Sequence, residues 1–387
     1  MNPDVRSKYP SEQESTLPGL YIHIPFCRSK CFYCDFYSMT GTKDQDSFVR
    51  SLIMEAQLYC GEFSDFDTFY VGGGTPSVLA IDDMKRIIKP LEGLFSFAAQ
   101  RESTIEVNPG DASLAHLRAL RELGFNRISL GVQSWDDGLL ALLGRRHTAE
   151  EAEMALVRCR RAGFDNISID LIYAIPGQNR RTWENTLRKT ISFDPEHLSC
   201  YELTIDRETP LGALVESGSI SRVDEAERAE FFLATAEFLA VAGFEQYEAS
   251  NFARSVSLRC RHNMKYWNHA AYLGLGPAAH SFNGKKRWAN HRSLALYITA
   301  LEEQCRPVAD EETLGNDELM LEALFLGMRT IDGIKIDQFN HRFHRDLLGE
   351  SGDRIGCLQK EGFLILEEGS LKPTTKGLLM ADSLALL

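Results

Sequence analysis

The feature that most constrains the fold is a regular alternation of strand-like and amphipathic helical runs from Gly19 onward. Runs rich in β-branched and aromatic residues predict strands at Leu20–Ile24, Thr68–Val71, Ser103–Val107, Arg127–Val132, Ile167–Tyr173 and His197–Leu203. Helical periodicity lies between them at Gln45–Tyr59, Ile81–Leu94, Ser113–Leu123, Thr148–Ala162 and Thr182–Ile191. This alternation implies parallel strands joined by crossover helices. Six such units, rather than eight, predict an α/β protein built on an open, partial (β/α)6 barrel.

The pattern changes after the sixth unit, and the change divides the chain. We expect a loose N-terminal tail over residues 1–18, the barrel over 19–250, a smaller α+β extension over 251–312 and a C-terminal module over 313–387. In the last segment helical runs precede a small hairpin, which is the order of elements in a winged-helix module. The acidic charge of the chain favours protein–protein packing over DNA binding for this module.

Charge and cysteine usage exclude several classes of protein. The formal net charge is −13, and the chain lacks the basic stripe that a nucleic-acid surface needs to neutralise phosphates. Nine cysteines are an odd number, and most are scattered, which indicates a reducing compartment and a cytoplasmic location. Met1–Pro18 lacks the apolar core of a signal peptide, and no run approaches the ~20 apolar residues that span a bilayer.

Three of the cysteines form a compact group directly after the first predicted strand. Cys27, Cys31 and Cys34 have C-x3-C-x2-C spacing, so one loop can direct three thiolates at a metal centre. A [4Fe–4S] cube usually takes four thiolates, and three leave one iron open for chemistry. A zinc site that also uses His23 and a set of simple buried thiols are the alternatives. Structural zinc sites usually present two separated cysteine pairs, so the spacing favours the cluster.

Polar and glycine-rich positions fall at the ends of the predicted strands. These positions are Gly72–Thr75, Glu106, Gln133, Asp170, Tyr201 and Glu202. Because parallel barrels build their sites at the carboxyl ends of the strands, we expect them to converge with the cysteine loop on one cavity for a polar ligand. The carboxylates of Glu106 and Asp170 would bind a cationic group or ribose hydroxyls. The alternatives are ion pairs with Arg127 or Arg145, and a satisfied core amide for Gln133.

Two of the ten histidines stand out by their surroundings. His262 lies in a dense aromatic and polar segment, and His280 ends a glycine-rich run. Imidazole is a common axial ligand of haem iron, which makes both residues candidates for a porphyrin ligand. A histidine satisfied by hydrogen bonds within the fold is the more common role for either one.

The cysteine spacing together with Gly-Gly-Gly-Thr-Pro resembles the radical S-adenosylmethionine (SAM) superfamily. The runs Tyr-Ile-His-Ile-Pro-Phe-Cys, Ile-Glu-Val-Asn-Pro, Leu-Gly-Val-Gln-Ser and Asp-Leu-Ile-Tyr are similar to the oxygen-independent coproporphyrinogen III oxidase group. The resemblance implies that Cys27, Cys31 and Cys34 bind a [4Fe–4S] cluster whose remaining iron is chelated by SAM. It also implies cleavage of SAM to methionine and a 5′-deoxyadenosyl radical, with an electron from a donor such as a flavodoxin or ferredoxin. The residues that match SAM-lining positions of the group are Tyr21, Tyr33, Gly73, Gly74, Thr75, Glu106, Gln133, Arg145 and Asp170.

Two departures separate the chain from the oxidase itself. The oxidase has a fourth cysteine two residues after the third, where this chain has Phe36. It also has a longer N-terminal segment over its substrate. In contrast, the segment around His262 resembles the H-N-x-x-Y-W signature of HemW-type haem chaperones. The haem-associated candidates that this resemblance implies, with His280 added, are His262, Asn263, Tyr266, Trp267 and His280.

The resulting hypothesis is a haem chaperone that binds haem as cargo and delivers it to haem-requiring client proteins. Respiratory membrane enzymes are among the expected clients, which would bring a cytoplasmic protein to the membrane periphery. The SAM site would be retained, so SAM cleavage stays open as an activity. The alternative is an enzyme that decarboxylates coproporphyrinogen III to protoporphyrinogen IX, and a third option is a radical SAM enzyme for another substrate. No nucleic-acid partner is expected.

Overall fold

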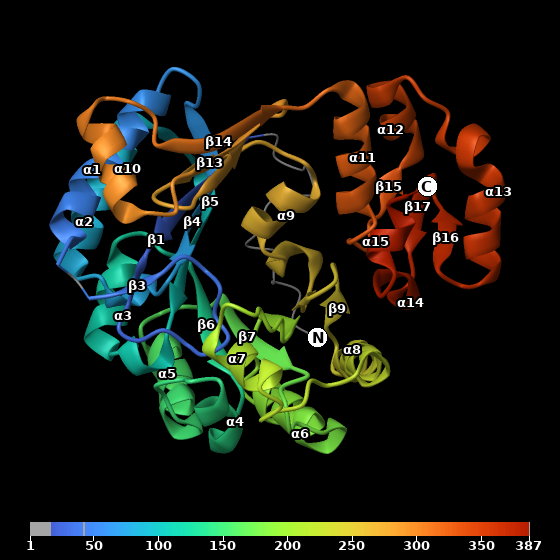
Figure 1. The fold of residues 1–387 in the computed structure, drawn as a ribbon, viewed down its shortest axis with the longest axis horizontal. Coiled ribbons are helices and arrows are strands. Elements are labelled where there is room, and N and C mark those ends of the chain that lie inside the picture. Colours follow the sequence, from blue (N-terminus) through green and yellow to red (C-terminus); the bar gives the residue numbers. More distant parts are fainter. Residues whose placement is uncertain (1–16, 42, 387) are drawn as a thin grey trace, which may run out of the picture.

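The computed structural model describes residues 17–41 and 43–386, so all but the last two residues of the predicted N-terminal tail lie outside the described part. Six parallel strands form the centre of the fold and follow one another in chain order (Figure 1). These strands are β1 (Gly19–Ile24), β4 (Asp65–Gly73), β5 (Ser96–Val107), β6 (Arg127–Gln133), β7 (Ile167–Tyr173) and β8 (His197–Glu202). Each pairs in parallel with its neighbour, which confirms the predicted open barrel.

Helices connect the successive strands, and most of them bury their apolar faces against the sheet in one continuous core. They are α1 (Gln45–Tyr59), α2 (Ile81–Leu94), α3 (Leu114–Glu122), α4 (Asp137–Leu142), α5 (Ala149–Arg161) and α6 (Arg180–Ile191). Local sequence fixes their ends. Thr148 and Glu151 form a reciprocal capping box at the start of α5, and Gly163 follows its end with φ of +90°. The predicted bounds of α1 and α2 agree with the structure.

The sheet continues beyond both edges of the barrel. Beside β1 lie β11 (Tyr272–Leu275), which is parallel to β1, and then the antiparallel strands β12 (His280–Phe282), β13 (Lys286–Asn290) and β14 (Val308–Thr313). Beside β8 lie the antiparallel β10 (Asn251–Ala253) and β9 (Glu245–Gln246). Twelve strands therefore share one sheet. The division of the chain at residue 250 stays a prediction, since strands from both sides of it are joined by hydrogen bonds.

Four more helices pack around this sheet. They are α7 (Pro210–Glu216), α8 (Glu225–Val241), α9 (Arg261–Trp267) and α10 (Leu294–Glu302). Short two-residue strands β2 (Phe26–Cys27) and β3 (Met39–Thr40) pair beside the end of β1. Helix α9 contains the H-N-x-x-Y-W segment and lies between the barrel and the C-terminal module (Figure 1).

The C-terminal module has a small core of its own. Its elements are α11 (Asn316–Gly327), β15 (Ile334–Lys335), α12 (Ile336–Phe343), α13 (Leu347–Lys360), β16 (Leu364–Glu367), β17 (Ser370–Pro373), α14 (Thr375–Leu378) and α15 (Ala381–Leu384). The three strands form a separate sheet in the order β15-β17-β16. Helices followed by a hairpin are the order that the sequence predicted. Among the described helices, none is both long and apolar enough to cross a membrane.

Candidate cluster and cofactor site

The cysteine loop is held tightly against the barrel. Its base is closed by the pairing of β2 with β3. Arg28 reaches from the loop to the buried carboxylate of Asp111, with 3.1 Å between Nε and Oδ1. The backbone N–H of Phe32 donates to the carbonyl of Leu143 at 3.0 Å. The loop conformation is therefore fixed by contacts with residues far along the chain, and this fixes the positions of the three cysteines.

The three cysteines of this loop are free thiols that interact with one another electrostatically. Cys27 is buried, whereas Cys31 and Cys34 are half-buried. Burial raises the pKa of the Cys27 thiol, and it raises the pKa of Cys34 to about 11, with smaller contributions from the other two sulfurs. Ionising all three together therefore requires a positive partner. Arg145 supplies part of it by donating to Cys31 Sγ at 3.4 Å, and iron would supply the rest.

The donor set fits an iron–sulfur cube better than a zinc ion. In the predicted zinc alternative His23 would be the fourth ligand, but both of its ring nitrogens are engaged. Nδ1 lies 3.1 Å from the hydroxyl of Tyr21, and Nε2 lies 2.8 Å from the carbonyl of Tyr37. Across residues 17–41 and 43–386, no three His, Cys, Asp or Glu side chains converge on the position of one metal ion. A cube takes each thiolate on a different iron, so its ligands need no such common point.

The glycine run after β4 packs directly against the cysteine loop. The backbone N–H groups of Gly74 and Thr75 donate to carbonyls of residues 24 and 26 at 2.7 and 2.9 Å. A Cβ at Gly74 would lie 3.0 Å from Cys27 Sγ, and one at Gly73, where φ is +111°, would lie 2.8 Å from the His23 ring. Thr75 also places its hydroxyl 3.3 Å from Cys27 Sγ. Glycine is therefore required at positions 73 and 74 for the two loops to approach.

Two carboxylates, Glu106 of β5 and Asp170 of β7, lie on the two strands that flank β6. Glu106 accepts from the Tyr70 hydroxyl at 3.0 Å and from the Gly73 N–H at 3.1 Å. Burial, and then the charge of Asp170, raises the pKa of Glu106 to about 7. Burial likewise raises the pKa of Asp170, which accepts from the hydroxyl of Ser129 at 2.8 Å. A cation between Glu106 and Asp170 would stabilise the ionised form of both carboxylates.

The predicted ion-pair alternative does not occur, because within the described residues neither carboxylate pairs with Arg127 or Arg145. Arg145 instead donates to the carbonyl of Gly131 at 2.7 Å, beside the amide of Gln133. Gln133 has φ of +67°, a left-handed conformation that is uncommon outside glycine and that often marks functional sites. The nine residues predicted to line a SAM site lie on strands of the barrel and on loops that follow them, and their role in binding SAM stays a prediction. They are Tyr21, Tyr33, Gly73, Gly74, Thr75, Glu106, Gln133, Arg145 and Asp170.

The H-N-x-x-Y-W segment lies beside this set, since the centroid of the His262 ring is 5.1 Å from that of Tyr70 and 6.3 Å from that of Tyr21. His262 is buried, with Nδ1 2.8 Å from the Thr68 hydroxyl and Nε2 2.9 Å from the Tyr266 hydroxyl. Its backbone N–H donates to the carboxylate of Glu102, and Lys265 in the next turn pairs with Asp67. Thr68 and Glu102 lie near the middle of β4 and β5, so the start of α9 is held against the middle of these two strands. His262 therefore has no free ring nitrogen in this arrangement.

The other haem-associated candidates are not gathered around His262. Tyr266 contacts its ring, whereas Asn263 and Trp267 are half-buried elsewhere on α9. His280 is exposed on β12 of the sheet extension. Their association with haem stays a prediction.

Sequence reasoning missed Tyr70 and His269, and it considered His23 only as a zinc ligand. Tyr70 hydrogen-bonds Glu106 and stacks on His262 with 5.1 Å between ring centroids. His23 connects the cysteine loop to the glycine run, as described above. His269 follows α9 and lines a cavity against the C-terminal module. For His269 a signal was available, since a histidine directly beyond the end of a predicted aromatic helix segment is an unusual choice of residue.

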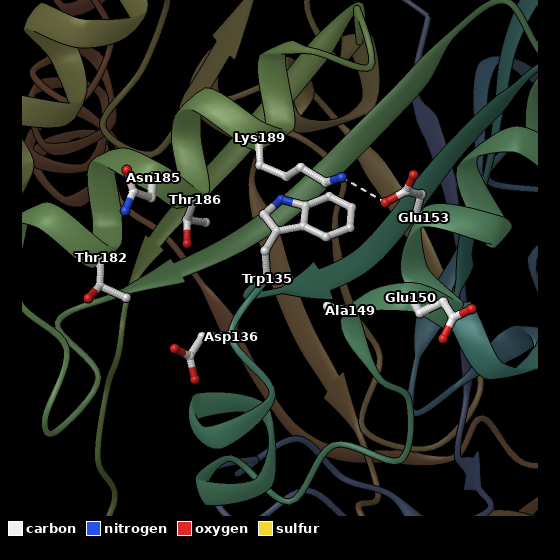
Figure 2. A pocket seen from close by; sticks show the side chains of 9 residues that line it. All are labelled: Trp135, Asp136, Ala149, Glu150, Glu153, Thr182, Asn185, Thr186 and Lys189. Carbon is white, nitrogen blue, oxygen red and sulfur yellow. Dashed lines mark hydrogen bonds and ion pairs between the residues drawn. The ribbon is translucent and has the colours of Figure 1, made fainter.

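A separate polar hollow of about 620 Å³ lies on the helical side of the barrel and contains none of the predicted site residues (Figure 2). Its lining comes from the turn after β6 and from α5 and α6, and comprises Trp135, Asp136, Ala149, Glu150, Glu153, Thr182, Asn185, Thr186 and Lys189. Lys189 reaches across the Trp135 ring to Glu153 at 2.7 Å (Figure 2). The indole N–H of Trp135 donates to Thr190 at 2.8 Å. The ammonium of Lys189 and the indole N–H of Trp135 already have partners within the fold, so we assign this hollow no ligand.

An open barrel of parallel strands with three thiols on the loop after its first strand defines the class of radical SAM proteins. A model of the radical SAM superfamily matches residues 21–190, and a model of the HemN C-terminal domain matches residues 314–380. The solved structure of coproporphyrinogen III oxidase (HemN) from Escherichia coli superposes with a TM-score of 0.84. It covers 96% of this chain and 90% of the oxidase at 23% identity, which establishes a shared fold.

Within this class, the chain belongs to the HemW family. It is 32% identical over 376 residues to the protein named heme chaperone HemW of Bacillus subtilis, covering 95% of this chain and 97% of that one. The protein of the same name from Synechocystis is 35% identical over 324 residues, or 81% of this chain and 78% of that one. Mouse radical S-adenosyl methionine domain-containing protein 1, mitochondrial, is 33% identical over 393 residues, covering 97% and 88%.

Proposed function

We propose that this protein binds haem and delivers it to haem-requiring client proteins, and that it retains a [4Fe–4S] cluster and a SAM site. The observation that carries the proposal is membership, over nearly the whole chain, in a family whose bacterial relatives are named haem chaperones. The clients would include respiratory membrane enzymes, reached from the cytoplasm. A flavodoxin or ferredoxin would supply electrons to the cluster.

Cys27, Cys31 and Cys34 would hold the cluster. With SAM bound at the open iron, the pair would supply one-electron cleavage chemistry. The chain's own contribution would be binding and orientation. The Gly73–Thr75 backbone would line the cofactor at close range, because no side chain intervenes at its two glycines.

The charged groups of the cavity suit the two ends of an amino-acid group. Glu106 and Asp170 would face cationic groups, since each of them is destabilised as an unpaired carboxylate. Arg145 would neutralise the cysteine loop and attract a carboxylate, because its buried Nε has no hydrogen-bond partner among the described residues. Tyr21, Tyr33 and Gln133 would complete the lining of the SAM site.

Coproporphyrinogen III oxidation is the alternative function, because the E. coli oxidase shares the fold. The sequence weighs against it at Phe36, which stands where the oxidase group has a fourth cysteine. Phe36 is 64% exposed at the rim of the cysteine loop, so its side chain covers the surface rather than lining the cluster position.

An anaerobic experiment separates the two functions. The full chain, reconstituted with iron and sulfide, is given haem and then mixed with an apo-haemoprotein, and haem transfer is followed by the Soret absorbance of the acceptor. In parallel it is given coproporphyrinogen III, SAM and a reductant, and protoporphyrin is measured by fluorescence after oxidation. Haem transfer without porphyrinogen turnover is expected. Turnover of coproporphyrinogen, or failure to bind haem, would overturn the proposal.

A further inference from the structure

Asp111 is a buried carboxylate at the point where three loops of the barrel meet. It ends the short 3-10 helix Pro109–Asp111, which follows β5, and its side chain is 1% exposed. A buried carboxylate loses its hydration, so it stays ionised only where cations and hydrogen-bond donors replace the water. The partners of Asp111 therefore show which segments its charge holds together.

The first partner is Arg28 of the cysteine loop, whose Nε lies 3.1 Å from Oδ1 of Asp111. Arg28 is the residue directly after Cys27, and its side chain is 59% exposed. Because the carboxylate of the pair is shielded from solvent, the attraction is screened less than that of a pair on the open surface. The ion pair therefore ties the start of the cysteine loop, next to its first thiol, to the turn after β5.

The second partner is Arg146 in the turn between α4 and α5, whose Nη2 donates to Oδ2 of Asp111 at 2.8 Å. The preceding residue, Arg145, donates to Cys31 Sγ at 3.4 Å. One turn thus directs successive guanidinium groups to the buried carboxylate and to the second thiol. Asp111 therefore fixes the backbone from which Arg145 reaches Cys31.

The third contact joins the segment after the glycine run to the same carboxylate. Ser77 is buried two residues beyond Thr75, and its hydroxyl lies 3.5 Å from Oδ2 of Asp111. The same hydroxyl oxygen accepts from the backbone N–H of Asn108 at 3.1 Å. Thr75 in turn has its hydroxyl 3.3 Å from Cys27 Sγ. Asp111 is therefore the common neighbour of three segments that each hold or contact a cysteine of the loop.

We propose that Asp111 is a positioning residue for the iron–sulfur cluster, which acts by holding Arg28 and Arg146. The inference rests on the proposed function, since it takes the cluster as the occupant of the three cysteines. Among the described residues Asp111 forms no hydrogen bond with a cysteine sulfur, so its effect passes through its partners. Without its charge the cysteine loop and the turn that carries Arg145 would be held less firmly, and the cluster would be bound less tightly.

Asp67 offers a matched control, because it too is a buried carboxylate between two cations. Its side chain is 2% exposed and pairs with Arg261 and Lys265, each at 2.9 Å. These ion pairs join β4 to α9 and not to the cysteine loop. A general loss of stability should therefore appear in Asp111→Asn and Asp67→Asn alike, whereas an effect on the cluster should appear in Asp111→Asn alone.

The test reconstitutes wild type and both variants of the full chain anaerobically with iron and sulfide. Loss of iron to a chelator is followed in time, and the electron paramagnetic resonance spectrum of the reduced cluster is recorded. Asp111→Asn should release iron about tenfold faster or more and have an altered spectrum. Asp67→Asn should match wild type in both measurements, although urea unfolding should show both variants to be less stable. Wild-type behaviour of Asp111→Asn, or equally fast release by both variants, would overturn the inference.

Arg28→Ala keeps the test decisive if Asp111→Asn does not fold, because this exposed side chain can be removed while Asp111 keeps Arg146. It should also speed the release of iron, and in that case a wild-type rate would overturn the positioning role and leave the proposed function standing. Where both variants fold, adding Arg28→Ala to Asp111→Asn should change the rate little, since the two substitutions break the same contact. If wild type takes up no cluster, the proposed cluster and this inference fail together.

Discussion

Replacing Glu106 by glutamine tests the cofactor cavity, because the fold holds this carboxylate where its charge is disfavoured. Burial, and secondarily the charge of Asp170, raises its pKa from the ordinary 4.5 to about 7. The hydrogen bonds from Tyr70 and from the Gly73 N–H oppose the shift but do not cancel it. The folded chain therefore keeps a proton on Glu106 at pH values where the unfolded chain has lost it.

The sign of the effect on stability follows from this difference. Below pH 4.5 Glu106 is protonated in both the folded and the unfolded state, so it does not lower the free energy of unfolding. Between 4.5 and about 7 the unfolded state alone ionises, so the free energy of unfolding falls with rising pH, and above 7 the loss is complete. At about 1.4 kcal/mol per pH unit the full loss is about 3 kcal/mol. Because the carboxylate is partly reached by solvent, we expect about 2 kcal/mol.

The assay compares urea unfolding of wild type and Glu106→Gln at pH 5 and pH 8. Glutamine keeps the shape, its carbonyl can accept from Gly73, and the Tyr70 hydroxyl can turn to accept from its amide. The variant should match wild type at pH 5 and exceed it by about 2 kcal/mol at pH 8. A difference that is equal at both pH values, or that reverses, would refute the reasoning.

Glu55 offers a matched control for the effect of Glu106 on SAM binding. It is fully buried against Tyr297 and Gly276, and burial raises its pKa to about 7 as well. Glu55→Gln should therefore show a similar pH-dependent gain in stability. Of the two carboxylates, only Glu106 is among the residues proposed to line the SAM site. The affinity of wild type and Glu55→Gln for SAM, a cationic ligand, should rise from pH 6 to pH 8, whereas that of Glu106→Gln should not.

Three further predictions concern the cluster, the glycine run and His262. Cys31→Ser should lose the iron and sulfide, about four of each per chain, that anaerobic reconstitution gives to wild type; zinc in place of iron in wild type would contradict the cluster. Gly74→Ala should also abolish reconstitution, because its Cβ would lie 2.9 Å from the Phe26 carbonyl, whereas Gly61→Ala, with open space around it, should reconstitute normally. His262→Ala should lower the free energy of unfolding, measured by urea unfolding, by about 1–3 kcal/mol for each buried hydroxyl that loses its partner. The same variant should leave the spectrum of haem-bound iron unchanged. A stable variant with an altered spectrum would place haem at the H-N-x-x-Y-W segment.

The sequence predicted the barrel well because its signals are local. Hydrophobic periodicity and helix caps lie within single elements, so the barrel strands β1 and β4 to β8 and the bounds of α1 and α2 were predictable. The short strands of the sheet extension were harder to predict. Strands β9 to β12 have two to four residues each, too short to show a period, and β11 pairs with β1 across some 250 residues of chain.

The candidate site likewise has features that the sequence could predict and features that it could not. The cysteine group, the glycine run and the strand-end polar residues could be found because parallel topology brings all strand ends to one edge. Side-chain partners could not be found. His23 as a link between the two loops, Tyr70 as a partner of Glu106 and Arg145 as a donor to Cys31 depend on packing between separate elements.

By itself, then, the sequence determined the class of fold and predicted the place of the metal chemistry, since both follow from spacings within a few residues. The tertiary structure decided what the histidines do. His262 meets Thr68 from 194 positions away and is consumed by that contact, whereas His269 is turned by a helix end into a cavity that exists only because the C-terminal module packs there. Hydrogen-bond satisfaction and cavities arise from long-range packing, and no local pattern specifies them.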